Sequence, residues 1–107
     1  MAANSATLIM SIISQIEVSD FERLYEIEQQ AHLVPWSFGT LKNNQGERYL
    51  NLKLIENNQI IGFAICQTVL DEATLFNIAI VPSHQGNGLG KLLLNELITR
   101  LKEKGVQ

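Results

Sequence analysis

The segment His84–Lys91 limits the possible folds more than any other part of the chain, because it joins two stretches of different hydrophobic period. It reads HQGNGLGK and holds three of the seven glycines. An apolar run that ends at Pro82 precedes it, and a leucine-rich stretch follows it. A helix N-terminus leaves backbone N–H groups unpaired, and glycine lets an anion approach them. The segment predicts a strand, a tight turn and a helix. The turn either binds a phosphate group or only connects the strand to the helix.

Three known phosphate-binding loops compete for this segment, and their spacing separates them. A Walker A loop needs four residues between its first glycine and Gly-Lys, whereas three follow Gly86 before that pair. A dinucleotide-binding fingerprint that starts at Gly86 needs a third glycine where Lys91 stands. The remaining pattern, Gln/Arg-x-x-Gly-x-Gly/Ala, is matched by Gln85–Gly90.

The N-terminal half predicts a short strand and two helices. Ser19 and Glu22 have the spacing of a capping box, and apolar residues then follow at helical intervals, which predicts a helix from about Asp20 to His32. Proline then breaks the chain, and a serine cap starts a short helix over Ser37–Asn43. A strand over Met10–Ile16 precedes these helices.

The central part predicts an antiparallel meander. Apolar and polar residues alternate from Tyr49, and an Asn-Asn turn joins this strand to a second one over Gln59–Leu70. The second strand is apolar on both faces, which favours a central position in the sheet. A third strand over Ala73–Val81 follows. The leucine-rich helix after the glycines is expected to end at Gly105 in a left-handed cap.

Composition places the chain among ordinary globular proteins with one domain, since 46% of the residues are apolar and 18% are charged. The formal net charge is −3, and the basic excess after Ala73 is too small for nucleic acid. A lone Cys66 and two histidines give neither a disulfide nor a metal site. With no signal peptide or membrane span in sight, we expect a cytoplasmic protein.

The glycine turn, the Val81-Pro82 pair before it and the leucine-rich helix after it resemble the coenzyme-binding core of the GNAT superfamily of N-acetyltransferases. Five further segments are similar to RimI-type ribosomal-protein alanine N-acetyltransferases, namely Glu28-Gln29, Ala31-His32, Pro35-Trp36-Ser37, Asn44–Tyr49 and Leu70–Ala79. The resemblance runs from Met10 to Val106. It implies an α/β GNAT fold over residues 10–107 and an N-terminal extension over residues 1–9.

The resemblance implies that acetyl-CoA lays its pyrophosphate on the glycine turn and its pantetheine arm along the preceding strand. The implied coenzyme-binding residues are Ile78, Ala79, Ile80, Gln85, Gly86, Asn87, Gly88, Leu89, Gly90 and Lys91. Asn87 departs from the family, which often has a basic or longer polar residue there, so phosphate binding would be slightly weaker. His32 and Trp36 fall in the region that closes over the peptide in the family, which implies a substrate-binding role.

The implied reaction is direct transfer of an acetyl group from acetyl-CoA to the α-amino group of the N-terminal alanine of a small-subunit ribosomal protein. In RimI-like enzymes the catalytic glutamate and tyrosine follow the leucine-rich helix, beyond Gln107, so no catalytic residue is assigned. Asp71 and Glu72 are expected to be solvated in a turn, and Cys66 to fill the core. The alternative is a non-catalytic acyl-CoA-binding module, or an inactive fragment that lacks the acid–base pair.

The predicted domain is incomplete at its C-terminal end, because a strand and helix of this kind normally lead into a parallel strand. The missing neighbour would leave the outer edge of the third strand and one face of the last helix uncovered. We therefore expect either a poorly ordered C-terminal part or a homo-oligomer in which a second copy covers this surface.

Overall fold

The computed structural model describes residues 11–106, so the expected extension over residues 1–9 and the start of the first strand at Met10 lie outside the described residues. Four strands form one antiparallel sheet in the order β2-β3-β4-β5. The strands are β2 (Ser11–Gln15), β3 (Leu52–Glu56), β4 (Gln59–Val69) and β5 (Glu72–Ile80). The expected meander is confirmed, and β4 is an inner strand as predicted.

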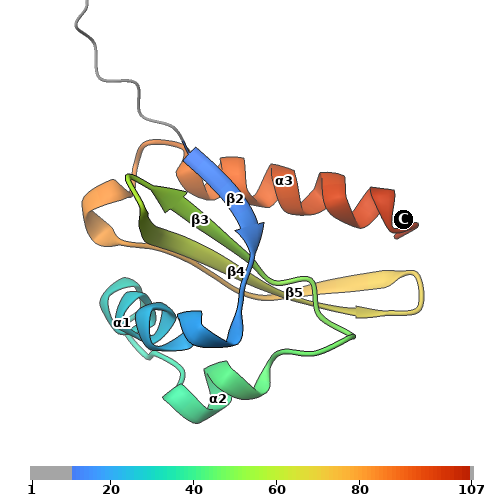
Figure 1. Cartoon of the computed structure of the whole chain (residues 1–107), viewed down its shortest axis with the longest axis horizontal. Coiled ribbons are helices and arrows are strands. Elements are labelled where there is room, and N and C mark those ends of the chain that lie inside the picture. Colours follow the sequence, from blue (N-terminus) through green and yellow to red (C-terminus); the bar gives the residue numbers. More distant parts are fainter. Residues whose placement is uncertain (1–10, 107) are drawn as a thin grey trace, which may run out of the picture.

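Helices cover both faces of this sheet (Figure 1). On one face lie α1 (Phe21–Ala31) and α2 (Phe38–Asn43), and on the other lies α3 (Leu89–Glu103). Two short 3₁₀ turns, η1 (Val18–Asp20) and η2 (Pro82–His84), lead into α1 and toward α3. This mixed α/β arrangement matches the expected fold class. No helix of residues 11–106 is long and apolar enough to cross a lipid bilayer.

The start of α1 differs from the sequence prediction. Ser19 lies inside η1 and does not cap the helix. The local contact comes from Asp20 instead, whose carboxylate accepts the Glu17 backbone N–H at 2.7 Å. The predicted cap of α2 is confirmed, since the Ser37 hydroxyl accepts the Thr40 N–H at 3.1 Å.

A buried lysine joins this N-terminal turn to the sheet. The Lys53 ammonium on β3 lies 2.6 Å from the Asp20 carboxylate and 3.4 Å from that of Glu17. Burial by itself would lower the pKa of Lys53, but the hydrogen bonds and attraction of these two carboxylates outweigh it and raise the pKa. Lys53 therefore stays charged and holds η1 against the sheet.

A β-bulge in the middle of β5 changes the face of the sheet toward which the following side chains point. Ile65 pairs with Asn77 and Cys66 with Leu75, so Phe76 is the extra residue. Ala73 lies against α3, and simple alternation would place Asn77 on that same face. The bulge turns Asn77 to the opposite face, where it contacts α1.

The core fills the space on both sides of β3 and β4. Its fully buried members include two phenylalanines and leucines from every helix. The largest of these side chains are Phe21, Phe63, Leu24, Ile27, Leu41, Leu52, Leu54, Ile65, Leu93 and Leu97. This packing fixes the end of β5 and the start of α3 relative to each other, and the turn between them carries the candidate site.

Candidate functional site

The turn between β5 and α3 has the left-handed backbone that its glycines predict. Gly86 has φ +84° and Gly88, at the N-cap of α3, has φ +77°. A β-carbon at either position would meet no atom within 4 Å, so the turn faces open space. No side chain caps this helix N-terminus in the described part of the chain. The arrangement suits an anion at the first N–H groups of α3.

A groove of about 370 Å³ runs from this turn along β5. Six of the ten predicted coenzyme-binding residues line it, together with Leu94: Ile78, Ala79, Ile80, Gln85, Gly90 and Lys91. The other four predicted residues, Gly86, Asn87, Gly88 and Leu89, form the turn at its end. Sequence reasoning missed Leu94, although its helical spacing from Gly90 and Lys91 places it on the same face of α3.

Gln85 has a structural contact in addition to its place on the groove wall. Its side-chain amide donates to the carbonyl oxygen of Ile80 at 2.8 Å. This bond fastens the turn to the last residue of β5. The glutamine of the motif therefore fixes the groove's shape.

The outer edge of β5 borders the groove. Among residues 11–106, β5 pairs only with β4 and is the last strand of the sheet. An edge strand presents unpaired N–H and C=O groups that an extended polyamide can use. The groove thus combines a charged end at Lys91 with a hydrogen-bonding wall along β5 and an apolar wall from α3.

Asn77 and Glu28 link the two predicted substrate-binding residues through one chain of hydrogen bonds on the opposite face of β5. His32 ends α1, and its Nε2–H donates to the Asn77 side-chain oxygen at 3.0 Å. The Trp36 backbone N–H donates to the buried carboxylate of Glu28 at 2.9 Å. Leu33 and Val34, in the loop between α1 and α2, are exposed. The loop is therefore tied to the strand that borders the groove.

Sequence reasoning missed Glu28 and Asn77. Glu28 occupies the same helical stripe as the apolar residues Leu24 and Ile27, and a carboxylate on a buried stripe was the available signal. Asn77 gave no such signal, because its direction depends on the bulge at Phe76.

Asp71, Glu72 and Cys66 lie where the sequence predicts. Asp71 and Glu72 are exposed at the turn between β4 and β5. Cys66 is 1% exposed, and burial raises the pKa of its thiol, so it is a poor nucleophile. Within the described ranges, no three metal-binding side chains come together.

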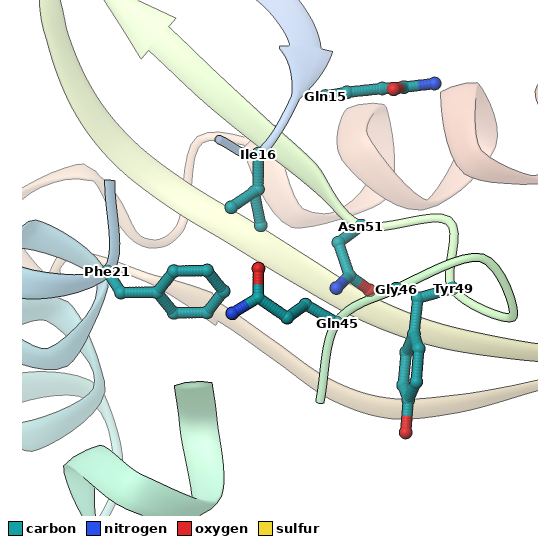
Figure 2. A pocket seen from close by; sticks show the side chains of 7 residues that line it. All are labelled: Gln15, Ile16, Phe21, Gln45, Gly46, Tyr49 and Asn51. Carbon is teal, nitrogen blue, oxygen red and sulfur yellow. The ribbon is translucent and has the colours of Figure 1, made fainter. Parts of the chain in front are cut away.

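A second cavity, of about 130 Å³, lies where β2, α1 and the loop before β3 meet. Figure 2 shows the Gln45 side chain extending toward the Phe21 ring, with Ile16 and Asn51 nearby. The Asn51 amide is already engaged, because it donates to the Asn44 carbonyl and accepts the Cys66 N–H. Ligand pockets are typically about 300–1,000 Å³, so this cavity is too small for a coenzyme.

An uncapped glycine turn at a helix N-terminus, beside a strand edge that residues 11–106 leave unpaired, is the arrangement expected for the coenzyme-binding core of an N-acetyltransferase. The model of the acetyltransferase (GNAT) family matches residues 11–107. The chain belongs to this family, which confirms the resemblance seen in its motifs.

Within this family, the chain is closely similar to curated enzymes of one kind. The chain is 89% identical over 98 residues to a [ribosomal protein bS18]-alanine N-acetyltransferase of Haemophilus influenzae, covering 92% of this chain and 67% of that protein. It is 54% identical to the enzyme of that name from Escherichia coli, covering 91% and 66%. The chain thus spans about two thirds of the length of these curated relatives.

Solved structures agree with the fold. The crystal structure of the ribosomal-protein-S18-alanine N-acetyltransferase from Escherichia coli superimposes with a TM-score of 0.89, covering 91% of this chain and 63% of that one. The PaiA N-acetyltransferase from Thermoplasma acidophilum, solved with coenzyme A, has a TM-score of 0.79 at 20% identity, covering 91% and 75%. The second likeness concerns the fold alone.

Proposed function

We propose that the chain binds acetyl-CoA in the groove beside β5 and serves the transfer of its acetyl group to the N-terminal alanine of ribosomal protein bS18. The observation that carries this proposal is the groove itself, in which the N-terminus of α3 meets the edge of β5 that no strand of residues 11–106 covers. The 89% identity to a bS18-alanine N-acetyltransferase supports the choice of substrate. The proposed compartment is the cytoplasm, without a nucleic-acid or membrane partner.

The coenzyme's chemistry matches the groove from one end to the other. Its pyrophosphate would accept hydrogen bonds from the backbone N–H groups of Gly86 to Lys91, and the Lys91 ammonium would add a full positive charge. Its pantetheine amides would pair with the backbone of Ile78–Ile80 as an added strand. The peptide would approach on the side of His32 and Trp36, which puts the two substrates on opposite sides of β5.

The proposed reaction needs no covalent enzyme intermediate. A base removes a proton from the peptide's α-ammonium, and the resulting amine attacks the thioester carbonyl. As the carbon–sulfur bond breaks, the nitrogen releases its second proton and an acid protonates the departing thiolate, which leaves the amide and coenzyme A. No carboxylate is among the residues that line the groove. That observation favours the second candidate function, an acyl-CoA-binding module without transfer.

Two measurements on this chain separate the candidates. Calorimetric titration with acetyl-CoA tests binding, and mass spectrometry of a peptide with the bS18 N-terminus tests transfer, with a peptide blocked at its α-amine as control. Binding with acetylation supports the transferase, and binding alone supports the module. Failure to bind acetyl-CoA contradicts both.

A matched pair of lysine variants tests where the coenzyme lies. Lys91→Ala removes the charge at the groove and is expected to weaken acetyl-CoA binding about five- to ten-fold, with the loss shrinking at high salt. Lys104→Ala removes a charge at the far end of the same helix and should leave the affinity unchanged. Equal effects of the two variants would contradict the proposed pyrophosphate position.

A further inference from the structure

The side chain of Glu28 is buried in the protein interior, where a carboxyl group is unusual. It lies on α1 and is 1% exposed, and burying an ionised group is costly unless each of its oxygens is paired. Both oxygens are used: Oε2 accepts the Trp36 backbone N–H at 2.9 Å, and Oε1 accepts the Asn77 amide at 2.8 Å. None of these bonds involves a residue that lines the groove along β5, so binding of the coenzyme does not explain them.

Asn77 extends this network to the end of α1. Its side-chain oxygen accepts the Nε2–H of His32 at 3.0 Å, and the bulge at Phe76 is what points it toward α1. The next residue along β5, Ile78, lines the coenzyme groove on the opposite face. The network therefore ends one residue away from the groove wall.

These polar contacts help to position the loop between α1 and α2. Its residues 33–35 are exposed, and Leu33 and Val34 pack against nothing in the described part of the chain that would hide them from solvent. The Trp36 side chain packs against the core, but the exposed residues 33–35 have few buried apolar contacts, so hydrogen bonds at the two ends of the loop restrict them. The contacts made by Glu28 to Trp36 and by Asn77 to His32 fix both ends of the loop.

We propose that Glu28 is a positioning residue that sets the loop over residues 32–37 against β5 and thereby fixes the approach of the acceptor peptide. This inference rests on the proposed function and adds a residue to it. Glu28 touches neither substrate and acts through Trp36 and Asn77. Because the coenzyme groove lies on the other face of β5, loss of Glu28 should weaken peptide binding without weakening acetyl-CoA binding.

A donor–acceptor exchange tests the contact itself. Glu28→Gln keeps the size and the bond from Trp36 but sets an amide NH₂ against the NH₂ of Asn77. Asn77→Asp alone sets two carboxylates face to face. The double variant reverses the polarity, so that the introduced amide donates to the introduced carboxylate, which still accepts from His32. All three hydrogen bonds are then regained at unchanged net charge.

The readouts separate positioning from a merely structural role. Glu28→Gln keeps the bond from Trp36 but loses the one to Asn77, which should loosen the loop. We therefore expect the Trp36 amide to exchange with solvent about ten-fold faster and the peptide dissociation constant to rise about ten-fold, the size expected for losing one hydrogen bond to a charged group. The acetyl-CoA dissociation constant should change less than about two-fold, since no group in the groove is altered. The double variant should return both altered values toward the wild type. Trp36 is the sole tryptophan, so its fluorescence reports the loop independently.

The control is Glu26→Gln on the same helix, whose exposed carboxylate pairs with Arg23; it should change nothing. The proposal is overturned if Glu28→Gln leaves the Trp36 amide or the peptide affinity unchanged, or if the double variant is no better than the single ones. It is also overturned if peptide and acetyl-CoA binding fall together. A wild type that binds no acetyl-CoA contradicts the proposed function instead, while Trp36 exchange still tests the Glu28 contact.

Discussion

At the scale of single residues, Gly88 links backbone geometry to the proposed coenzyme contact. Its φ of +77° costs an alanine about 1 to 2 kcal/mol, and the added methyl would stand in the open space at the turn. Gly88→Ala should therefore lower the free energy of unfolding by that amount and weaken acetyl-CoA binding about ten-fold. Thermal unfolding and calorimetry measure the two effects.

Gly105→Ala is the matched control for this substitution. Gly105 has φ +91° at the other end of α3, and a β-carbon there also meets no atom within 4 Å. The same strain should cost similar stability but leave acetyl-CoA affinity intact. If both variants weaken binding equally, strain in α3 rather than the turn is responsible.

Burial of Cys66 predicts how the folding stability depends on pH. Burial raises the pKa of its thiol above the unfolded value, and a weaker backbone hydrogen bond involving Thr74 opposes this. Folding stability is then unaffected below the unfolded pKa of about 8.5 and falls as pH rises above it, because only the unfolded chain releases the proton. Urea unfolding between pH 7 and pH 10 should show a steeper loss in the wild type than in Cys66→Ala, on the order of 1 kcal/mol per pH unit. Parallel curves would contradict this.

Residues of special backbone geometry could be predicted from the sequence, whereas the polar network could not. The glycines of the turn and the Asn57-Asn58 hairpin have the positive φ that their types favour. The bond between Glu28 and Asn77 joins positions 49 residues apart. It depends on a bulge that no local pattern at Phe76 indicates.

At the scale of elements, Gly62 sets how closely β4 and β5 approach. A β-carbon there would lie 2.9 Å from the Ala79 carbonyl oxygen and would overlap the Ile80 side chain. Gly62→Ala should cost about 1 to 3 kcal/mol through overpacking. Because Ala79 and Ile80 line the groove, acetyl-CoA affinity should fall as well. Urea unfolding gives the stability change.

Gly39 provides the comparison for Gly62. It lies in α2, where a β-carbon would be 4.0 Å from the Ser37 hydroxyl oxygen and so meets only ordinary contact. Alanine favours a helix over glycine by about 1 kcal/mol, so Gly39→Ala should be neutral or stabilising. A loss of stability equal to that of Gly62→Ala would contradict the steric explanation.

Element types were predictable from hydrophobic period, and element ends only where a capping residue acts locally. The extent of α3 and its left-handed cap at Gly105 follow from local sequence. The first hairpin strand was expected from Tyr49, but Tyr49 forms only an isolated bridge to Gln67 and β3 begins at Leu52. That difference reflects the contacts of Asn51, whose amide bonds to Asn44 and Cys66 replace a regular ladder.

At the scale of the whole molecule, the described residues leave one apolar surface open beside the edge of β5. A cavity of about 210 Å³ there is lined by Ala73, Ile98, Leu101, Lys102 and Val106, and Ile98 is 41% exposed. The curated relatives are about half as long again as the matched region. An open strand edge beside exposed apolar side chains favours association between copies.

Of the two alternatives that the sequence left open, a poorly ordered C-terminal part or a homo-oligomer, this surface favours the second, and we predict that the chain self-associates. Ile98→Lys places a charge on the open surface and should shift the protein toward the monomer, because burying an unpaired ammonium between copies is costly. Leu92→Lys alters a similarly exposed leucine of α3, 44% exposed, that lies outside that cavity, and it should associate as the wild type does. Sedimentation velocity over a concentration series distinguishes the three proteins. A wild type that stays monomeric at every concentration, or equal behaviour of both lysine variants, would show that this surface does not drive association.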